Sequence, residues 1–366
     1  MKKVIYYSVF LTLIPLCSIG QDTDNDSTSL DYNKILSYCM QTDLEPILDI
    51  IDVDTTKLNK KDLFFKLRFE DRFKYSTDQN SFNSQPKSSV DSLVNIFKEY
   101  WRVALLNPDQ NYDSLLMQDL NSFLDVKYTT KAESFILDSC VTNIDSSITD
   151  YVSSRGYYSI GLARVGRLYD LLIWKTQIDT IYTFSIKKEE ISAKVIFLED
   201  FISLGWGRYA TLDKNIGGWA DEEALYCVTE SYDIESDEFK IHYLAHEGRH
   251  FEDYKIFPNL SGYDLEYRAK LTELSLAQET IFPLIEDFIS SANYDDDNQH
   301  PVANYVVIKK LSKKLFNSEF EDDIEKWKAL DIAVINETAY TLLIENTEEL
   351  HNEGDDIEFY IKKFEQ

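Results

Sequence analysis

The chain has 366 residues, which is enough for two domains of ordinary size. Hydrophobic residues make up 44% and charged residues 28%, a composition typical of globular proteins and not of disordered or fibrous ones. The 37 Lys and Arg residues against 65 Asp and Glu residues give a formal net charge of −28. Such a field repels phosphate backbones and anionic lipids, so nucleic-acid binding is not expected.

Residues 1–20 have the pattern of an export signal. Two lysines open the chain, an apolar stretch covers residues 4–16, and small residues at positions 18 and 20 suit cleavage between Gly20 and Gln21. The stretch is shorter than the roughly 20 residues that span a bilayer. We therefore expect an exported bacterial protein, periplasmic or secreted, without a transmembrane segment after signal removal. Acylation of Cys17 is a less favoured alternative, because a proline and a leucine precede it where small residues are usual.

The next part of the chain is predicted to be helical. The polar residues 21–30 indicate a flexible leader. Apolar residues then recur every three or four positions, as in KKDLFFKLRFEDRFKY (60–75) and SSVDSLVNIFKEYWRVALL (88–106). A run rich in Ser, Asn and Gln at 76–89 indicates a loop. We predict a helical N-terminal domain over residues 31–150.

Glycine usage changes sharply after this region. No glycine occurs between Gln21 and Arg155, whereas nine lie between Gly156 and Gly262. The middle of the chain is therefore expected to need tight turns and unusual backbone angles, a first indication of where a site lies.

Four runs rich in β-branched and aromatic residues predict strands in the same part of the chain. They are 169–175, 178–186, 191–198 and 224–229. A long helix over 263–290, kinked at Pro283, and two or three further helices are expected to follow. We predict an α+β protein whose second domain, residues 151–366, combines a small mixed sheet with a helical C-terminal part.

One motif carries recognisable chemistry. The segment EFKIHYLAHEGRHFEDYK contains the pattern His-Glu-x-x-His at His246, Glu247 and His250. Histidines four residues apart lie on one face of a helix and can bind one metal ion, while the glutamate between them can reach a water on that metal. Three of the five histidines of the chain, including His242, fall in this segment. His242 is expected to be an outer or surface residue and not a fourth ligand.

A helix is expected at this motif on independent grounds. Ser236 is suited to cap its first turn, and acidic residues follow directly. An apolar stripe, beside which the histidines lie, consists of Ile241, Leu244, Ala245, Gly248 and Phe251.

The segment from about Ala224 to Ala277 resembles the zincin metallopeptidases. The resemblance implies a zincin-like catalytic core in which the strand before the motif helix is the sheet edge that pairs with a peptide, a role expected here for residues 224–229. The metzincin branch is excluded, because Asp253 and Ile256 occupy the positions of its last glycine and histidine. The gluzincin branch completes the site with a glutamate on the next helix, and DLEYRAKLTELSLA (264–277) supplies Glu266 and Glu273.

The choice between the two glutamates depends on the loop between the helices. Phe257-Pro258 is expected to end the first helix, and the second is expected to begin near residue 263 after a short turn. Because Glu266 then lies in the first turn or so, it is the favoured third ligand, and Glu273 the alternate. Glu273 lies about 10 Å further along the axis at 1.5 Å per residue.

The resemblance implies an exported zinc metallopeptidase with one Zn²⁺ per chain and Glu247 as the general base. Its substrate would be a peptide or protein. Two alternatives remain open: an exported zinc-binding interaction protein without turnover, and a zinc hydrolase acting on a non-peptide substrate. The residues considered as donors to the oxyanion are Tyr263, Tyr267, Arg268 and His300.

Overall fold

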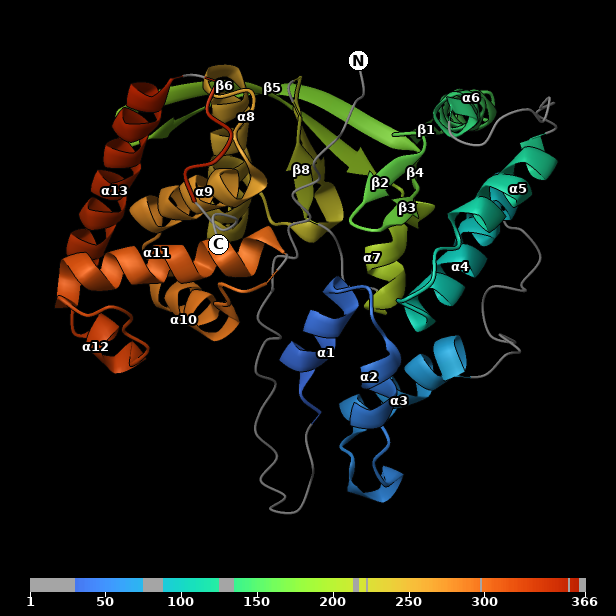
Figure 1. The fold of residues 1–366 in the computed structure, drawn as a ribbon, viewed down its shortest axis with the longest axis horizontal. Helices are drawn as coiled ribbons and strands as arrows, with labels where there is room; N and C mark the ends of the chain where they lie inside the picture. Colours follow the sequence, from blue (N-terminus) through green and yellow to red (C-terminus); the bar gives the residue numbers. More distant parts are fainter. Residues whose placement is uncertain are drawn as a thin grey trace. The chain divides into compact units, whose positions relative to one another are not determined.

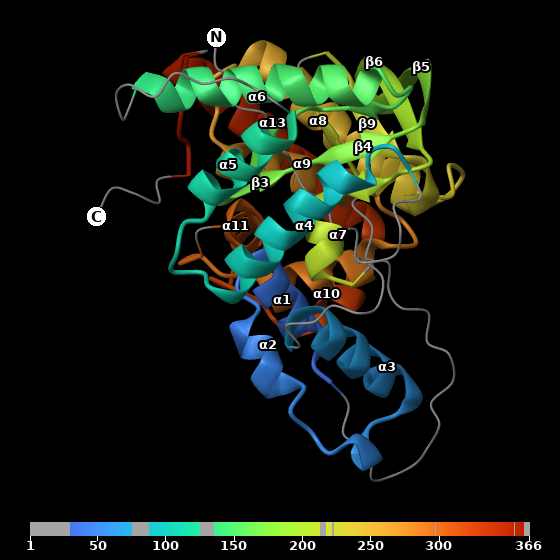
Figure 2. The same ribbon diagram turned by 90° about the vertical axis from the view of Figure 1, so that its right-hand side faces the viewer.

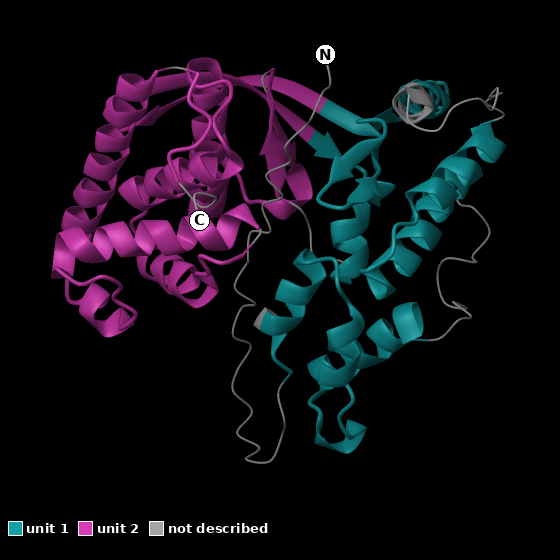
Figure 3. Cartoon of the chain, in the orientation of Figure 1, with its two compact units in different colours: residues 1–5, 13–177, 198–216 teal, residues 6–12, 178–197, 217–366 magenta. Residues whose placement is uncertain are grey.

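The computed structural model describes residues 30–74, 88–124, 135–212, 217–221, 223–296, 298–354 and 356–361. Within these ranges the chain forms two compact units (Figure 3). The first comprises residues 30–177 and 198–212, and the second comprises 178–197 and 217–361. The predicted signal peptide, Cys17 and the predicted leader up to residue 29 lie outside the described residues. Leu30, the last residue of that leader, is buried, and its amide donates to Asp62.

The first unit is mainly helical, as the sequence predicted. Its α-helices are α1 (Tyr32–Met40), α2 (Glu45–Ile50), α3 (Lys60–Phe69), α4 (Asp91–Leu106), α5 (Asp113–Leu124), α6 (Phe135–Ser153) and α7 (Gly205–Ala210). A 3₁₀ turn, η1 (Thr55–Lys57), precedes α3, and a short π-helix, η2 (Glu70–Lys74), continues it. Helix α5 packs against both α4 and α6 (Figure 2). Most of the predicted loop at 76–89 lies outside the described residues.

Short strands complete the first unit. One sheet has the order β1-β4-β7 and a second pairs β2 with β3, all antiparallel. The strands are β1 (Tyr158–Ser159), β2 (Ala163–Val165), β3 (Leu168–Asp170), β4 (Leu172–Trp174) and β7 (Ser203–Leu204). The single strand predicted at 169–175 is therefore wrong in detail: β3 and β4 belong to different sheets, with Leu171 between them. Trp101 joins helix to strand, since its indole N–H donates to the carbonyl of Tyr169.

The bounds of the two units differ from the predicted domains, which are divided between residues 150 and 151. Within the described residues the chain passes between the units three times, and the first two crossings fall inside the long strands β5 (Thr176–Ile186) and β6 (Glu189–Glu199). The apolar core of the first unit includes residues that follow position 150 in the chain. Leu171, Ile173 and Trp206 pack in the same cluster as Phe97 and Trp101 of α4.

The second unit contains a four-stranded sheet with the order β5-β6-β9-β8, where β8 is Gly218–Ala220 and β9 is Leu225–Val228. Strands β8 and β9 are antiparallel and are joined by a tight turn in which Asp221 accepts the amides of Glu223 and Ala224. The expected role of residues 224–229 as the sheet edge is therefore wrong. The chain folds back before β9 and adds β8 outside it, so β9 is internal and β8 is terminal.

One face of this sheet covers the helical segment that carries the motif (Figure 1). Ile191, Val195 and Leu225 pack against Phe239, Leu244 and other residues of that segment. Gly248 allows the close approach, because a Cβ atom there would lie 2.4 Å from the ring of Phe184 in β5.

The remaining helices follow the motif segment. They are α9 (Gly262–Leu276), α10 (Ile281–Ser291), α11 (Gln299–Phe316), α12 (Ile324–Lys328) and α13 (Ile332–Glu353). Helix α9 packs against the motif segment, and α11 and α13 pack on α9. The long helix predicted over 263–290 is two helices, and they are separated at residues 277–280, not kinked at Pro283. Pro283 lies in the first turn of α10, where its missing N–H has no intrahelical partner to lose.

The α+β class is thus confirmed, and three helices follow α10 as expected. No helix among the described ranges combines the length and apolarity needed to cross a membrane.

Candidate metal centre

The motif lies where two kinds of helix meet. Residues Glu238–Ala245 form a π-helix, η4, and His246–Ile256 continue it as the α-helix α8. As predicted, Ser236 accepts a hydrogen bond at the start of this segment, from the amide of Phe239 at 3.2 Å. Helix α8 ends before Phe257, and α9 begins at Gly262 with Ser261 accepting the amide of Asp264. The short connection brings the start of α9 beside α8.

Three side chains from these two helices converge. Ligand atoms of His246, His250 and Glu266 all lie within 4.8 Å of one another, and all three residues are buried. The two Nε2 atoms are 3.0 Å apart. Oε2 of Glu266 lies 3.6 Å from Nε2 of His246, and Oε1 lies 3.4 Å from Nε2 of His250. This group can hold a metal ion, and it contains Glu266, the favoured third residue.

Glu273, the alternate, lies in the same cluster but contacts the opposite nitrogen of a ligand. Its Oε1 is 2.6 Å from Nδ1 of His246. Since that carboxylate oxygen accepts the proton on Nδ1, the lone pair of Nε2 is left facing His250 and Glu266. Glu273 is thus placed to orient the candidate ligand His246 and does not belong to the group of three that could hold a metal ion.

The electrostatic state of the cluster suits cation binding. Burial lowers the pKa of His246 to about 4, despite the opposing effect of Glu273, so this imidazole is neutral at neutral pH. Burial alone would raise the pKa of both glutamates, but the neighbouring histidines outweigh it. The pKa of Glu266 lies well below its usual value, and that of Glu273 is about 2. Two carboxylates are therefore ionised beside the neutral imidazole of His246. Burial alone would lower the pKa of His250, but Glu266 outweighs it and raises that pKa, so in the absence of a metal His250 holds a proton more readily than His246.

Glu247 is fully buried, and neither of its carboxylate oxygens has a hydrogen-bond partner among the described residues. Burial raises its pKa to about 8, an effect opposed by His250 and reinforced by the charges of Glu266 and Glu273. The backbone amide of Ala220 in β8 is close enough to lower this pKa weakly, but it makes no hydrogen bond of ordinary geometry. The carboxyl group thus lies between the convergent ligands and the terminal strand of the sheet.

The four residues considered as donors to the oxyanion differ in their surroundings. Nδ1 of His300, from the first turn of α11, lies 3.0 Å from Oε2 of Glu266, and 23% of the His300 side chain is exposed. Arg268 is fully engaged elsewhere, because its guanidinium binds Asp253, Asn346 and Thr347. Tyr267 is buried in the helical core beside Lys310, and Tyr263 is partly buried against the same core.

Comparison with known proteins found no relative of this chain. No family model, curated protein or solved structure matches this chain. Its site must be interpreted from its own geometry.

The residues present fit a zinc ion. Zinc lies about 2.0–2.2 Å from nitrogen and oxygen ligands, so tetrahedral ligands are about 3.3–3.5 Å apart. The three separations among His246, His250 and Glu266 are 3.0, 3.4 and 3.6 Å, so one lies inside this range and the other two lie within about 0.3 Å of it. Two imidazoles with one carboxylate form a donor set used by catalytic zinc sites, which keep a fourth position for water or substrate.

Proposed function

We propose that this protein is a zinc-dependent metallopeptidase of the gluzincin type, exported by the cell, in which His246, His250 and Glu266 hold the metal and Glu247 is the general base. The supporting observation is the buried, unpartnered carboxyl group of Glu247 beside a set of three ligand side chains. Burying a carboxyl group without a hydrogen bond costs several kcal/mol, of the order of 2–7 for a polar group. A structural metal site would gain nothing from that group, whereas a hydrolytic site requires it.

Each residue then has a defined role. When bound, zinc acts as a Lewis acid and lowers the pKa of a water molecule to about 7. Glu247 accepts a proton from the attacking water as the peptide carbonyl is hydrated, and it returns that proton to the leaving nitrogen. A divalent cation nearby favours the ionised form of Glu247, which is the form that accepts the proton.

The sheet supplies a place for the substrate in this proposal. Strand β8 is the terminal strand, and Ala220 within it lies beside Glu247. An extended peptide that pairs with the outer edge of β8 would bring its carbonyl toward the base. This assigns to β8 the role that the zincin resemblance implied for residues 224–229.

A second candidate is a zinc-binding interaction protein without turnover. The observation in its favour is that His246, Glu247 and Glu266 have no solvent exposure, since structural zinc sites are closed and catalytic ones open. Catalysis requires the substrate to displace whatever covers Glu247. His300, which is partly exposed and contacts Glu266, marks one side from which the cluster reaches the surface.

Incubation of zinc-loaded protein with a broad peptide library, with and without a zinc chelator, tests the proposal. We expect cleavage that the chelator abolishes and that added zinc restores. Stoichiometric zinc without cleavage of any peptide would contradict the peptidase and favour the interaction protein. Hydrolysis confined to added ester or amidase substrates would instead indicate a non-peptide hydrolase.

A further inference from the structure

The metal ligand His246 is the inner end of a chain of contacts that extends beyond Glu273. Glu273 uses both carboxylate oxygens on histidines: Oε1 is 2.6 Å from Nδ1 of His246, and Oε2 is 2.6 Å from Nδ1 of His242. The second ring nitrogen of His242 lies 3.0 Å from Oγ1 of Thr280. Thr280, His242, Glu273 and His246 are therefore connected in series.

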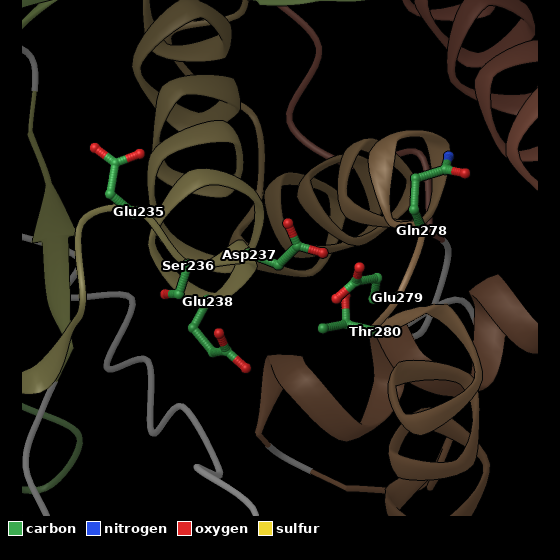
Figure 4. Close-up of a pocket in the computed structure, with 7 residues that line it drawn as sticks. All are labelled: Glu235, Ser236, Asp237, Glu238, Gln278, Glu279 and Thr280. Atoms are coloured by element: carbon green, nitrogen blue, oxygen red, sulfur yellow. The ribbon is translucent and has the colours of Figure 1, made fainter.

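The outer end of this chain lies at a pocket of about 470 Å³ (Figure 4). Thr280 lines it, together with acidic residues from the start of η4 and from the turn after α9. The remaining lining residues are Glu235, Ser236, Asp237, Glu238, Gln278 and Glu279. The chain of contacts thus runs from a surface pocket to a ligand with no solvent exposure.

His242 lies in η4, four residues before His246, so the two imidazoles lie on the same face of the helical segment and can reach one carboxylate. A π-helix has more residues per turn than an α-helix and is rare, and short π segments are frequent at functional sites. Here η4 ends at Ala245, directly before the motif. His242 and His246 both direct Nδ1 toward Glu273 of α9, so one carboxylate bridges two imidazoles.

We propose that His242 is a positioning residue of the metal centre, which acts through Glu273 to hold His246 in the tautomer and orientation that bind the metal. The reasoning is geometric. Without His242, Oε2 of Glu273 loses its 2.6 Å partner inside a buried site, and the carboxylate can rotate away from Nδ1 of His246. Outer partners of this kind, when mutated, typically cost about 10–100-fold in metal affinity. This inference rests on the proposed zinc centre.

Two amide substitutions separate the hydrogen bond from the shape of the side chain. In His242→Asn the amide nitrogen takes the place of Nδ1, so the contact with Glu273 is retained. In His242→Gln it takes the place of Nε2, so the contact with Thr280 is retained and that with Glu273 is lost. His351→Gln is the matched control, because His351 is exposed and its ring lies against Phe257 outside the centre.

The zinc dissociation constant of each variant is measured by competition with a chromophoric chelator, and urea unfolding of the chelator-treated proteins shows whether each variant folds. We expect His242→Gln to bind zinc about 10–100-fold more weakly than the wild type, and His242→Asn and His351→Gln to stay close to it. Equal affinities for the Asn and Gln variants, whether both normal or both weakened, would overturn the role assigned to His242. A wild-type protein that binds no zinc would overturn the zinc centre itself and the inference with it.

Discussion

Glu247→Gln is expected to abolish peptide hydrolysis and to leave zinc bound. The amide keeps the size of the side chain but cannot accept the proton of the attacking water. A general base contributes about 10²–10⁴-fold to the rate, and we expect a loss in that range. Because Glu247 is not in the ligand group, the variant should keep the zinc content of the wild type. Initial rates on a cleaved library peptide, measured beside zinc content, check both parts.

Glu252→Gln is the matched control for this prediction. Glu252 lies on the same helix, but it is partly exposed and pairs with Lys255 at 2.7 Å. We expect its activity to equal that of the wild type. If Glu247→Gln retained most of the hydrolysis, Glu247 would not be the base.

Arg268→Met is expected to lower the free energy of unfolding by about 3–5 kcal/mol. The guanidinium of Arg268 is fully buried and donates from Nε and Nη2 to Asp253, at 2.7 and 2.9 Å. From Nη1 it also donates to Asn346 and Thr347. Its removal leaves the buried Asp253 carboxylate with only Arg249, 3.8 Å away, as a cationic neighbour. It also removes the hydrogen bonds by which α9 is joined to Asp253 of α8 and to Asn346 and Thr347 of α13. Urea denaturation of the zinc-loaded protein measures the change.

Lys313→Met is the control for the loss of a positive charge. Lys313 pairs with Glu319 at 3.1 Å, with 58% and 76% of the two side chains exposed. Exposed pairs of this type contribute about 0–1 kcal/mol, so little change is expected. Replacing both partners, as in Arg268→Met with Asp253→Leu, should recover part of the loss, because no unpaired charge then remains. A loss below about 1 kcal/mol for Arg268→Met would show that the buried pair does not fix these helices.

The motif and its third residue were accessible from the sequence because their geometry is local. His246 and His250 are one helical turn apart, and the break at Phe257 and Pro258 limits how far along α9 a facing residue can lie. That reasoning selected Glu266, and the structure brings Glu266 into the ligand group.

The position of β8 depended on a contact that no local pattern shows. Strand β9 was recognisable from its composition, but the three residues of β8 carry too little pattern to be read as a strand. The order of strands in a sheet is decided by tertiary pairing. For that reason the sequence indicates β9 as the edge of the sheet, whereas the structure has β8 there.

The winding of η4 was also missed. The apolar spacing of this segment is compatible with the 3.6-residue repeat of an α-helix, which places His242 one turn before His246 but does not indicate a shared partner. Glu273 could only be recognised as that partner once both Nδ1 atoms were seen to face it.

The glycine-rich middle of the chain indicated turns and not the metal centre. Gly156, Gly161, Gly166 and Gly205 have positive φ values, and all four lie in the first unit. The candidate ligands lie in the second unit, on helices with ordinary backbone angles. Glycine density therefore reported turn geometry in the first unit and close packing in the second, as at Gly248 against Phe184, and it is a weaker guide to chemistry than the spacing of histidine and glutamate.

Elemental analysis of protein purified without added metal tests the zinc centre most directly. We expect close to one zinc per chain in the wild type and loss of most of it in Glu266→Ala. Glu273→Ala should retain zinc with a smaller loss of activity, although its zinc affinity should fall at least about 10–100-fold, as in His242→Gln. If zinc were lost from Glu273→Ala but kept by Glu266→Ala, the third ligand would be Glu273. Stoichiometric iron in the wild type would identify the metal as iron, since two histidines and one carboxylate also suit Fe(II). A wild-type protein that is purified without metal, and that takes up no zinc when zinc is offered, would contradict the account.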